Sequence, residues 1–234
     1  MQRSCALRGV LLNRLFRCVR AAAGLMIAAS GSFLQLQAAL GLNPWNMLNE
    51  GLSLSLPLTF GQASIAISMM VICVDLIMRE SIGLGTILDA LVVGWTFDFL
   101  LWLEPIPVQT SLPFQLFFML LGCFVLQFGN FVYMGAGLSC GPRDAFLVGI
   151  GKRFPKVPIG RVNMAITGIV LVGGMLLGSK LGFGTFFNIF GGSIIMDLVF
   201  GALHFEPRSV QHENLLQTIA AISAAHKADR AAVR

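Results

Sequence analysis

The chain has 234 residues, of which 56% are hydrophobic and only 12% are charged. Soluble domains carry about 25% charged residues, so this composition excludes an ordinary soluble globular domain. The formal net charge of +5 does not indicate a nucleic-acid partner, because the basic residues follow a membrane-orientation pattern instead.

Six apolar stretches in the sequence approach the roughly 20 residues that a helix needs to cross the hydrocarbon core of a bilayer. In chain order they are Ala22–Leu40, Gly61–Met78, Gly85–Leu103, Phe114–Ala136, Gly160–Gly178 and Thr185–His204. A basic segment, residues 1–21, precedes them, and an Ala-rich tail, residues 205–234, follows them. The sequence therefore predicts an all-α membrane protein with six spans. The tail is predicted either to lie on the membrane surface as an amphipathic helix or to stay mobile.

The distribution of Lys and Arg predicts the orientation of these spans. Fifteen of the sixteen basic residues fall on one side of a six-span topology. Only Lys180 falls on the other side, beside Glu50 and Glu104. Cytoplasmic loops carry such an excess of basic residues. Both termini are therefore predicted to be cytoplasmic, in a bacterial inner membrane, with the lipid bilayer as the main partner and no nucleic acid.

The second half of the sequence repeats the first. The matched pairs are Gly24/Gly122, Gly31/Gly129, Phe33/Phe131, Pro44/Pro142, Asn46/Asp144, Gly61/Gly160, Asp89/Asn188 and Asp98/Asp197. Repeat one covers residues 22–103 and repeat two covers residues 113–204, each with three spans. Because three is odd, the second repeat is predicted to insert upside down relative to the first. Such inverted repeats are common among secondary transporters. A duplicated membrane protein without a transport role is the alternative.

A Gly-Pro break interrupts each repeat, at "LGLNPWN" and again at "LSCGPRD". Proline is favoured in the first turn of a helix, so the breaks predict short helices over about Trp45–Leu54 and Arg143–Gly151. One interpretation lays these helices flat at the membrane interface, with Trp45 as an aromatic anchor. The other lets them dip inward as half-helices. In that case their N-termini, with Trp45, Asn46, Arg143 and Asp144, would bind an anionic group on a substrate.

Acidic residues inside the predicted spans are costly, so they are expected to face the bundle interior or a wet cavity. Asp75 is expected to pair with Arg79 one turn away. Two repeat-related pairs have two interpretations, as proton or cation sites that couple transport or as structural hydrogen-bonding groups. These pairs are Asp98 with Asp197 and Asp89 with Asn188.

No constellation for catalysis emerges from the sequence. The three His residues fall at or beyond the last span, and the five Cys residues show no metal-binding spacing. The sequence therefore predicts no enzyme activity, no catalytic residue, no metal and no cofactor.

The pattern "LGLNPWN … GQAS … GLGT", repeated as "LSCGPRD … IGRV … GFGT", resembles the YczE-like bacterial integral membrane proteins, which are related to the YyaS and YitT membrane proteins. The resemblance covers about Gly24 to Leu203. In that family the first break more typically reads Gly-Pro-Trp-Asp, so Asn43 and Asn46 are departures. The resemblance supports the fold and implies no substrate or catalytic residue.

The leading hypothesis is an inner-membrane secondary transporter, or permease, for a small solute, which would carry an anionic group under the half-helix interpretation. The first alternative is the substrate-binding subunit of a multi-component importer, which would need an ATPase partner. The second alternative is a membrane sensor or scaffold that transports nothing. Homo-oligomer formation stays open.

Overall fold

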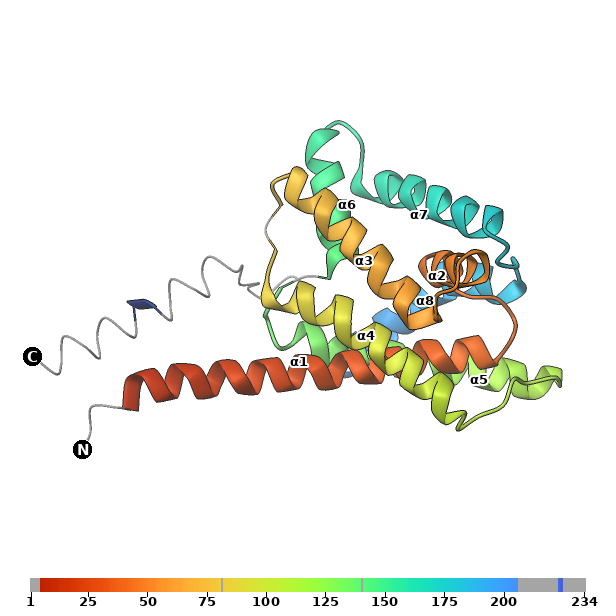
Figure 1. Cartoon of the computed structure of the whole chain (residues 1–234), viewed down its shortest axis with the longest axis horizontal. Coiled ribbons are helices and arrows are strands. Elements are labelled where there is room, and N and C mark those ends of the chain that lie inside the picture. Colours follow the sequence, from red (N-terminus) through yellow and green to blue (C-terminus); the bar gives the residue numbers. More distant parts are fainter. Residues whose placement is uncertain (1–4, 81, 140, 206–222, 225–234) are drawn as a thin grey trace, which may run out of the picture.

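The structure is a computed structural model that describes residues 5–80, 82–139, 141–205 and 223–224. In these residues the chain forms eight α-helices, six long and two short (Figure 1). They are α1 (Cys5–Gln37), α2 (Pro44–Ser55), α3 (Phe60–Ile77), α4 (Leu84–Leu103), α5 (Leu112–Met134), α6 (Pro142–Arg153), α7 (Ile159–Leu176) and α8 (Phe183–Ala202). The prediction of an all-helical protein is confirmed. Most of the predicted C-terminal tail lies outside the described residues.

The helices begin and end close to where the apolar pattern places them. Five of the six expected spans match a helix to within two residues at each end, and the short helices after both breaks are present as α2 and α6. The exception is α1, which begins at Cys5 and not near Ala22. The segment before Ala22 is rich in Arg, Leu and Ala, which favour a helix even though the arginines exclude it from an apolar count.

Four helices are long and apolar enough to cross a membrane, namely Leu11–Gln37 within α1, α3, α4 and α5. Helix α8 joins them if its two parts, which are bent by 41° relative to each other, count as one span. Helix α7 offers a shorter apolar stretch, Gly160–Leu176.

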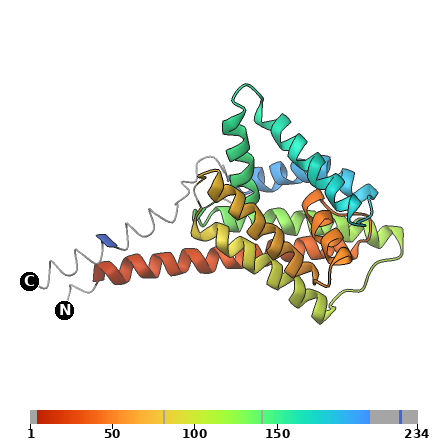
Figure 2. The same ribbon diagram turned by 45° about the horizontal axis from the view of Figure 1, so that its top comes forward.

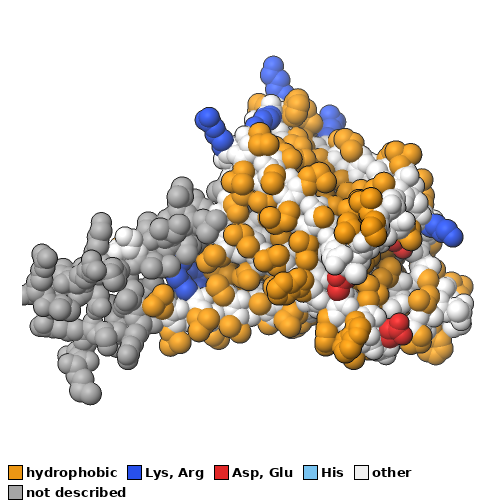
Figure 3. Space-filling model, viewed as in Figure 1, with side chains coloured by type: hydrophobic (Ala, Val, Ile, Leu, Met, Phe, Trp, Pro, Cys, Tyr) orange, Lys and Arg blue, Asp and Glu red, His pale blue; other side chains and the backbone are white. Residues whose placement is uncertain are grey.

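Large apolar side chains cover the outside of the bundle (Figure 3). Side chains that are more than half exposed include Leu12, Trp95, Trp102, Met164, Leu176 and Phe190. Soluble monomers rarely expose apolar patches on this scale, whereas lipid tails solvate them readily. The surface is therefore that of a multi-pass membrane protein.

Helices α1 and α5 pack against each other through glycines (Figures 1 and 2). A β-carbon on Gly24 would lie 2.5 Å from the amide nitrogen of Tyr133, and one on Gly31 would lie 2.7 Å from the carbonyl oxygen of Gly122. Early residues of α1 thus meet late residues of α5, so the two helices run antiparallel. Small residues permit such close approach of helices in membranes.

In the contact between α1 and α5, glycines of one half of the chain pack against glycines of the other half. Gly24 lies against Gly129, and their repeat mates Gly122 and Gly31 lie against each other. The lengths of the helices repeat as well. Helices α2 and α6 have 12 residues each, α3 and α7 have 18, and α4 and α8 have 20.

The loops before α2 and α6 cross onto the opposite half. The amide of Gly184 donates to the carbonyl oxygen of Leu40 at 2.6 Å. Gly41, with a positive φ of 109°, lies against Gly182. In the counterpart loop, Ser139 lies against Gly85 and its hydroxyl is 2.9 Å from that of Thr86. Each Gly-Pro break therefore rests on the "GxGT" turn of the other repeat.

The two halves of the chain differ in how their second and third long helices pack. Helix α3 packs along α4, and a β-carbon on Gly61 would overlap the backbone of Gly94. Their counterparts α7 and α8 make no comparable contact in the described part of the chain, and a β-carbon on Gly160 would meet nothing within 4 Å. Helix α7 instead packs on α2 and α6.

Candidate functional site

A cavity of about 470 Å³ lies at the centre of the bundle. Its volume is within the range of about 300–1,000 Å³ that is typical of small-molecule sites. The four residues expected to bind a substrate all line it, Trp45 and Asn46 from α2 and Arg143 and Asp144 from α6. Asp89 from α4 lines it too. Further polar side chains in its wall are Ser32, Asn43, Ser64, Ser68, Gln127, Asn130, Tyr133, Asn163 and Thr167.

The Gly-Pro breaks bring these residues inward because each starts a helix inside the bundle. Pro44 is the first residue of α2, and the Asn43 side chain accepts a hydrogen bond from the amide of Asn46 at 3.0 Å. Asn43, a departure from the usual family motif, is thus the N-cap of α2. In repeat two, Gly141 takes this place and has no side chain to cap α6.

Helix α2 is packed within the protein and does not lie on its surface. Pro44, Asn46, Met47 and Asn49 are buried. Trp45 is half-buried, with the guanidinium carbon of Arg143 at 5.0 Å from its ring centroid, which is a cation–π contact. This packing favours the half-helix interpretation over that of a flat interfacial helix with a Trp anchor.

Two carboxylates and one guanidinium share the cavity. From the point that a β-carbon on Gly141 would occupy, Oδ2 of Asp89 is 2.8 Å away and Oδ2 of Asp144 is 3.9 Å away. Arg143 is within electrostatic reach of both acids. The structure therefore adds Asp89 to the predicted set, because Gly141 leaves room for its carboxylate. Arg143, which was counted with the cytoplasmic loops, lines the cavity.

Asn46 has an unused donor in the wall of the cavity. Its side chain is only 6% exposed. Its Oδ1 accepts a hydrogen bond from Nδ2 of Asn49 at 3.4 Å, which directs the amide, while its Nδ2 has no partner among the described residues. A buried donor without a partner costs about 1–3 kcal/mol, so a bound acceptor would be stabilised there.

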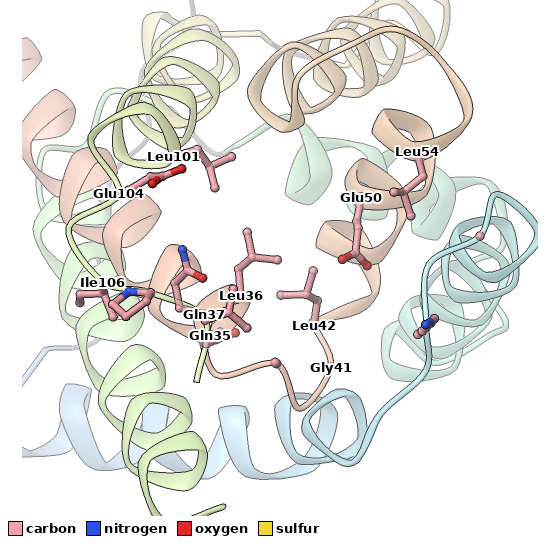
Figure 4. Close-up of a pocket in the computed structure, with 15 residues that line it drawn as sticks. Gln35, Leu36, Gln37, Gly41, Leu42, Glu50, Leu54, Leu101, Glu104 and Ile106 are labelled. Carbon is pink, nitrogen blue, oxygen red and sulfur yellow. The ribbon is translucent and has the colours of Figure 1, made fainter. Parts of the chain in front are cut away.

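A second cavity, the vestibule, lies where α1 and α4 end and α2 approaches its end (Figure 4). Its volume is about 800 Å³, and Glu50, Glu104 and Lys180 line it together. The three charged residues that the predicted topology places on the side opposite the other basic residues thus line one cavity. Oε2 of Glu50 accepts a hydrogen bond from the hydroxyl of Ser179 at 2.5 Å.

A hydrophobic cluster, here called the plug, borders both cavities. Its buried members are Ala29, Phe33, Leu42, Met47, Phe60 and Phe97. Leu42 also lines the vestibule, whereas Ala29 also lines the central cavity. The rings of Phe60 and Phe97 stack with centroids 4.2 Å apart. Beyond ordinary apolar periodicity, no sequence pattern predicts the plug.

The remaining predicted residues lie elsewhere. Asp98 accepts hydrogen bonds from the Thr59 hydroxyl at 2.5 Å and from the Gly61 amide at 2.7 Å, so it binds the N-terminus of α3. Its repeat mate Asp197 is exposed on α8. Asn188 bonds to the Gly184 carbonyl at 3.0 Å. None of these three side chains is among the described residues that line the central cavity. Their coupling role stays a prediction.

The expected pair between Asp75 and Arg79 is wrong. Asp75 is fully buried, and neither carboxylate oxygen has a hydrogen-bond partner among the described residues. Arg79 lies beyond the end of α3 with a positive φ of 60°, so it is not one helical turn from Asp75 on a continuous helix. An i,i+4 pair requires that continuity.

A helical bundle with an apolar outside and a polar cavity at its centre defines an integral membrane protein. The sequence profile of the DUF6198 family, described as a family of unknown function, matches residues 15–204. The chain belongs to this family.

Two relatives support the assignment. An uncharacterized protein of Haemophilus influenzae is 31% identical over 161 residues, which cover 69% of this chain and 72% of the relative. The uncharacterized membrane protein YczE of Bacillus subtilis is 31% identical over 166 residues, which cover 70% of this chain and 75% of the relative. The resemblance to YczE-like proteins is confirmed. No solved structure matches the chain.

Proposed function

We propose that this protein is a secondary transporter of the bacterial inner membrane, with six spans in two inverted repeats and cytoplasmic termini. The observation that carries the proposal is the central cavity, into which each half contributes the two residues after its own Gly-Pro break. Substrate sites of inverted-repeat transporters are built in this way, from half-helices at the interface of the repeats.

The antiparallel packing of α1 and α5 supports an inverted second half. The glycine contacts support it as well, because Gly24 packs against Gly129 while their repeat mates Gly122 and Gly31 pack against each other. The apolar stretch of α7, Gly160–Leu176, is at the short end of the range of about 17–25 residues for a span.

The two cavities support alternating access. The plug contributes Leu42 to the lining of the vestibule and Ala29 to the lining of the central cavity. The central cavity also has exposed residues in its lining, Asp144 and Asn163. The proposed cycle opens the plug and closes α7 onto α8, in the way that α3 already packs on α4.

The inverted insertion is tested with two single cysteines at repeat-related positions. In a cysteine-free background, Leu56→Cys and Phe154→Cys would each place a thiol at the exposed end of a short helix. A membrane-impermeant maleimide applied to intact cells is expected to label only Leu56→Cys. Phe154→Cys should react only after the membrane is permeabilised. Labelling of both from the same side would reject the inverted repeat, and with it this proposal.

A further inference from the structure

We infer that the central cavity binds a small zwitterion, with its ammonium group beside Asp89 and Asp144 and its carboxylate beside the Nδ2 of Asn46. The inference rests on the proposed function and deepens it, since this zwitterion is the solute to be transported. It also replaces the anion that the helix N-termini alone suggested.

The charges of the cavity favour an ammonium group. Asp89 and Asp144 contribute two negative charges, and Arg143 contributes one positive charge that already contacts Trp45. Asp89 lies within electrostatic reach of both Arg143 and Asp144. The side chains that line the cavity therefore carry a net negative charge, and net charge inside a membrane protein is costly. A solute that carries an ammonium group offsets this cost, whereas a simple anion increases it.

The unpartnered donor of Asn46 favours an acceptor on the same solute. Nδ2 of Asn46 is buried and lines the cavity that holds the acids. Carboxylate oxygens accept from amide donors, and a charge-assisted hydrogen bond is stronger than a neutral one. The lining of the cavity thus offers both a hydrogen-bond donor and carboxylates, which matches a molecule with both charges.

The vestibule repeats the charge balance of the cavity. It holds Glu50 and Glu104 against Lys180, so two acids again face one base. An excess of acidic side chains raises the local concentration of solutes that carry a cationic group. The vestibule therefore favours such solutes.

Matched probes test the assignment on the purified full-length protein. The panel contains the common α-amino acids and glycine betaine, and for each amino acid its N-acetyl derivative and its amide. We expect at least one zwitterion to raise the melting temperature, and both of its derivatives to bind at least tenfold more weakly. Equal binding of the N-acetyl derivative would overturn the inference in favour of an anion. Equal binding of the amide would overturn the role of Asn46. No stabilisation by any zwitterion in the panel would overturn it outright.

Variants locate the site. Asn46→Ala and Asp144→Asn are expected to weaken binding of the zwitterion at least tenfold, and Asp89→Asn serves as a third variant should either of these fail to fold. Lys152→Ala is the control, because this side chain is 63% exposed and pairs with Glu80 outside the cavity. Unchanged affinity in every folded cavity variant would overturn the inference.

A counterflow assay in liposomes distinguishes the zwitterion site from the proposed transport. Binding without exchange of the labelled zwitterion would remove the proposed transport and leave the site. Opposite-side cysteine labelling without binding of any zwitterion would remove the site and leave the transport proposal.

Discussion

Gly31→Ala is expected to abolish the folded protein, although alanine is intrinsically the better helix former by about 1 kcal/mol. A β-carbon at this position would overlap the backbone of Leu126 and lie 2.7 Å from the carbonyl oxygen of Gly122. Backbone atoms on a packed helix cannot move aside, so α1 and α5 must separate. Overpacking typically costs about 1–3 kcal/mol and occasionally more, and a clash with two backbone groups belongs at the upper end of this range. Size-exclusion chromatography and thermal unfolding in detergent would measure the loss.

Gly168→Ala is the matched control, because it also lies within an apolar helix but a β-carbon there would meet nothing within 4 Å. It is expected to be neutral or stabilising by up to about 1 kcal/mol. Similar behaviour of the two variants would contradict the glycine-mediated packing of α1 on α5.

Asp98→Ala is expected to destabilise the protein by about 3 kcal/mol, since it removes two hydrogen bonds to a charged acceptor. These bonds, from the Thr59 hydroxyl and the Gly61 amide, hold the N-terminus of α3 against α4. The positive end of the α3 dipole adds to their strength. The melting temperature of the purified variant measures the effect.

Asp197→Ala is the comparison, as its side chain is exposed on an apolar helix. Removing an exposed charge from an apolar helix should leave stability unchanged or raise it. Equal losses in the two variants would show that the repeat mates have the same environment, contrary to the packing of α3 and α7.

The spanning helices follow from the sequence because each contains a long apolar stretch, and the two short helices follow because each begins at a Pro. The meeting of Trp45 and Asn46 with Arg143 and Asp144 also follows, since the repeat places both breaks at equivalent positions. The repeat alone could not place Asp89 in that cavity, because its mate is an asparagine that bonds within its own helix.

The sequence also does not predict that Asp98 and Asp197 have different surroundings. A sequence repeat implies equal surroundings for matched residues. The surroundings differ because α3 packs on α4 while α7 packs on α2 and α6, and nothing local to either acid encodes that choice. The plug is hidden for a similar reason, since its three phenylalanines come from three different helices.

The crossing of the two Gly-Pro loops has a consequence for how the chain is built. The carbonyl of Leu40 accepts the amide of Gly184, and Ser139 contacts Thr86, so each repeat completes a turn that belongs to the other. Each half of the chain therefore relies on the other to complete one of its own turns. A half made without its partner, cut at the connection between Glu104 and Ser111, would leave these contacts unmade.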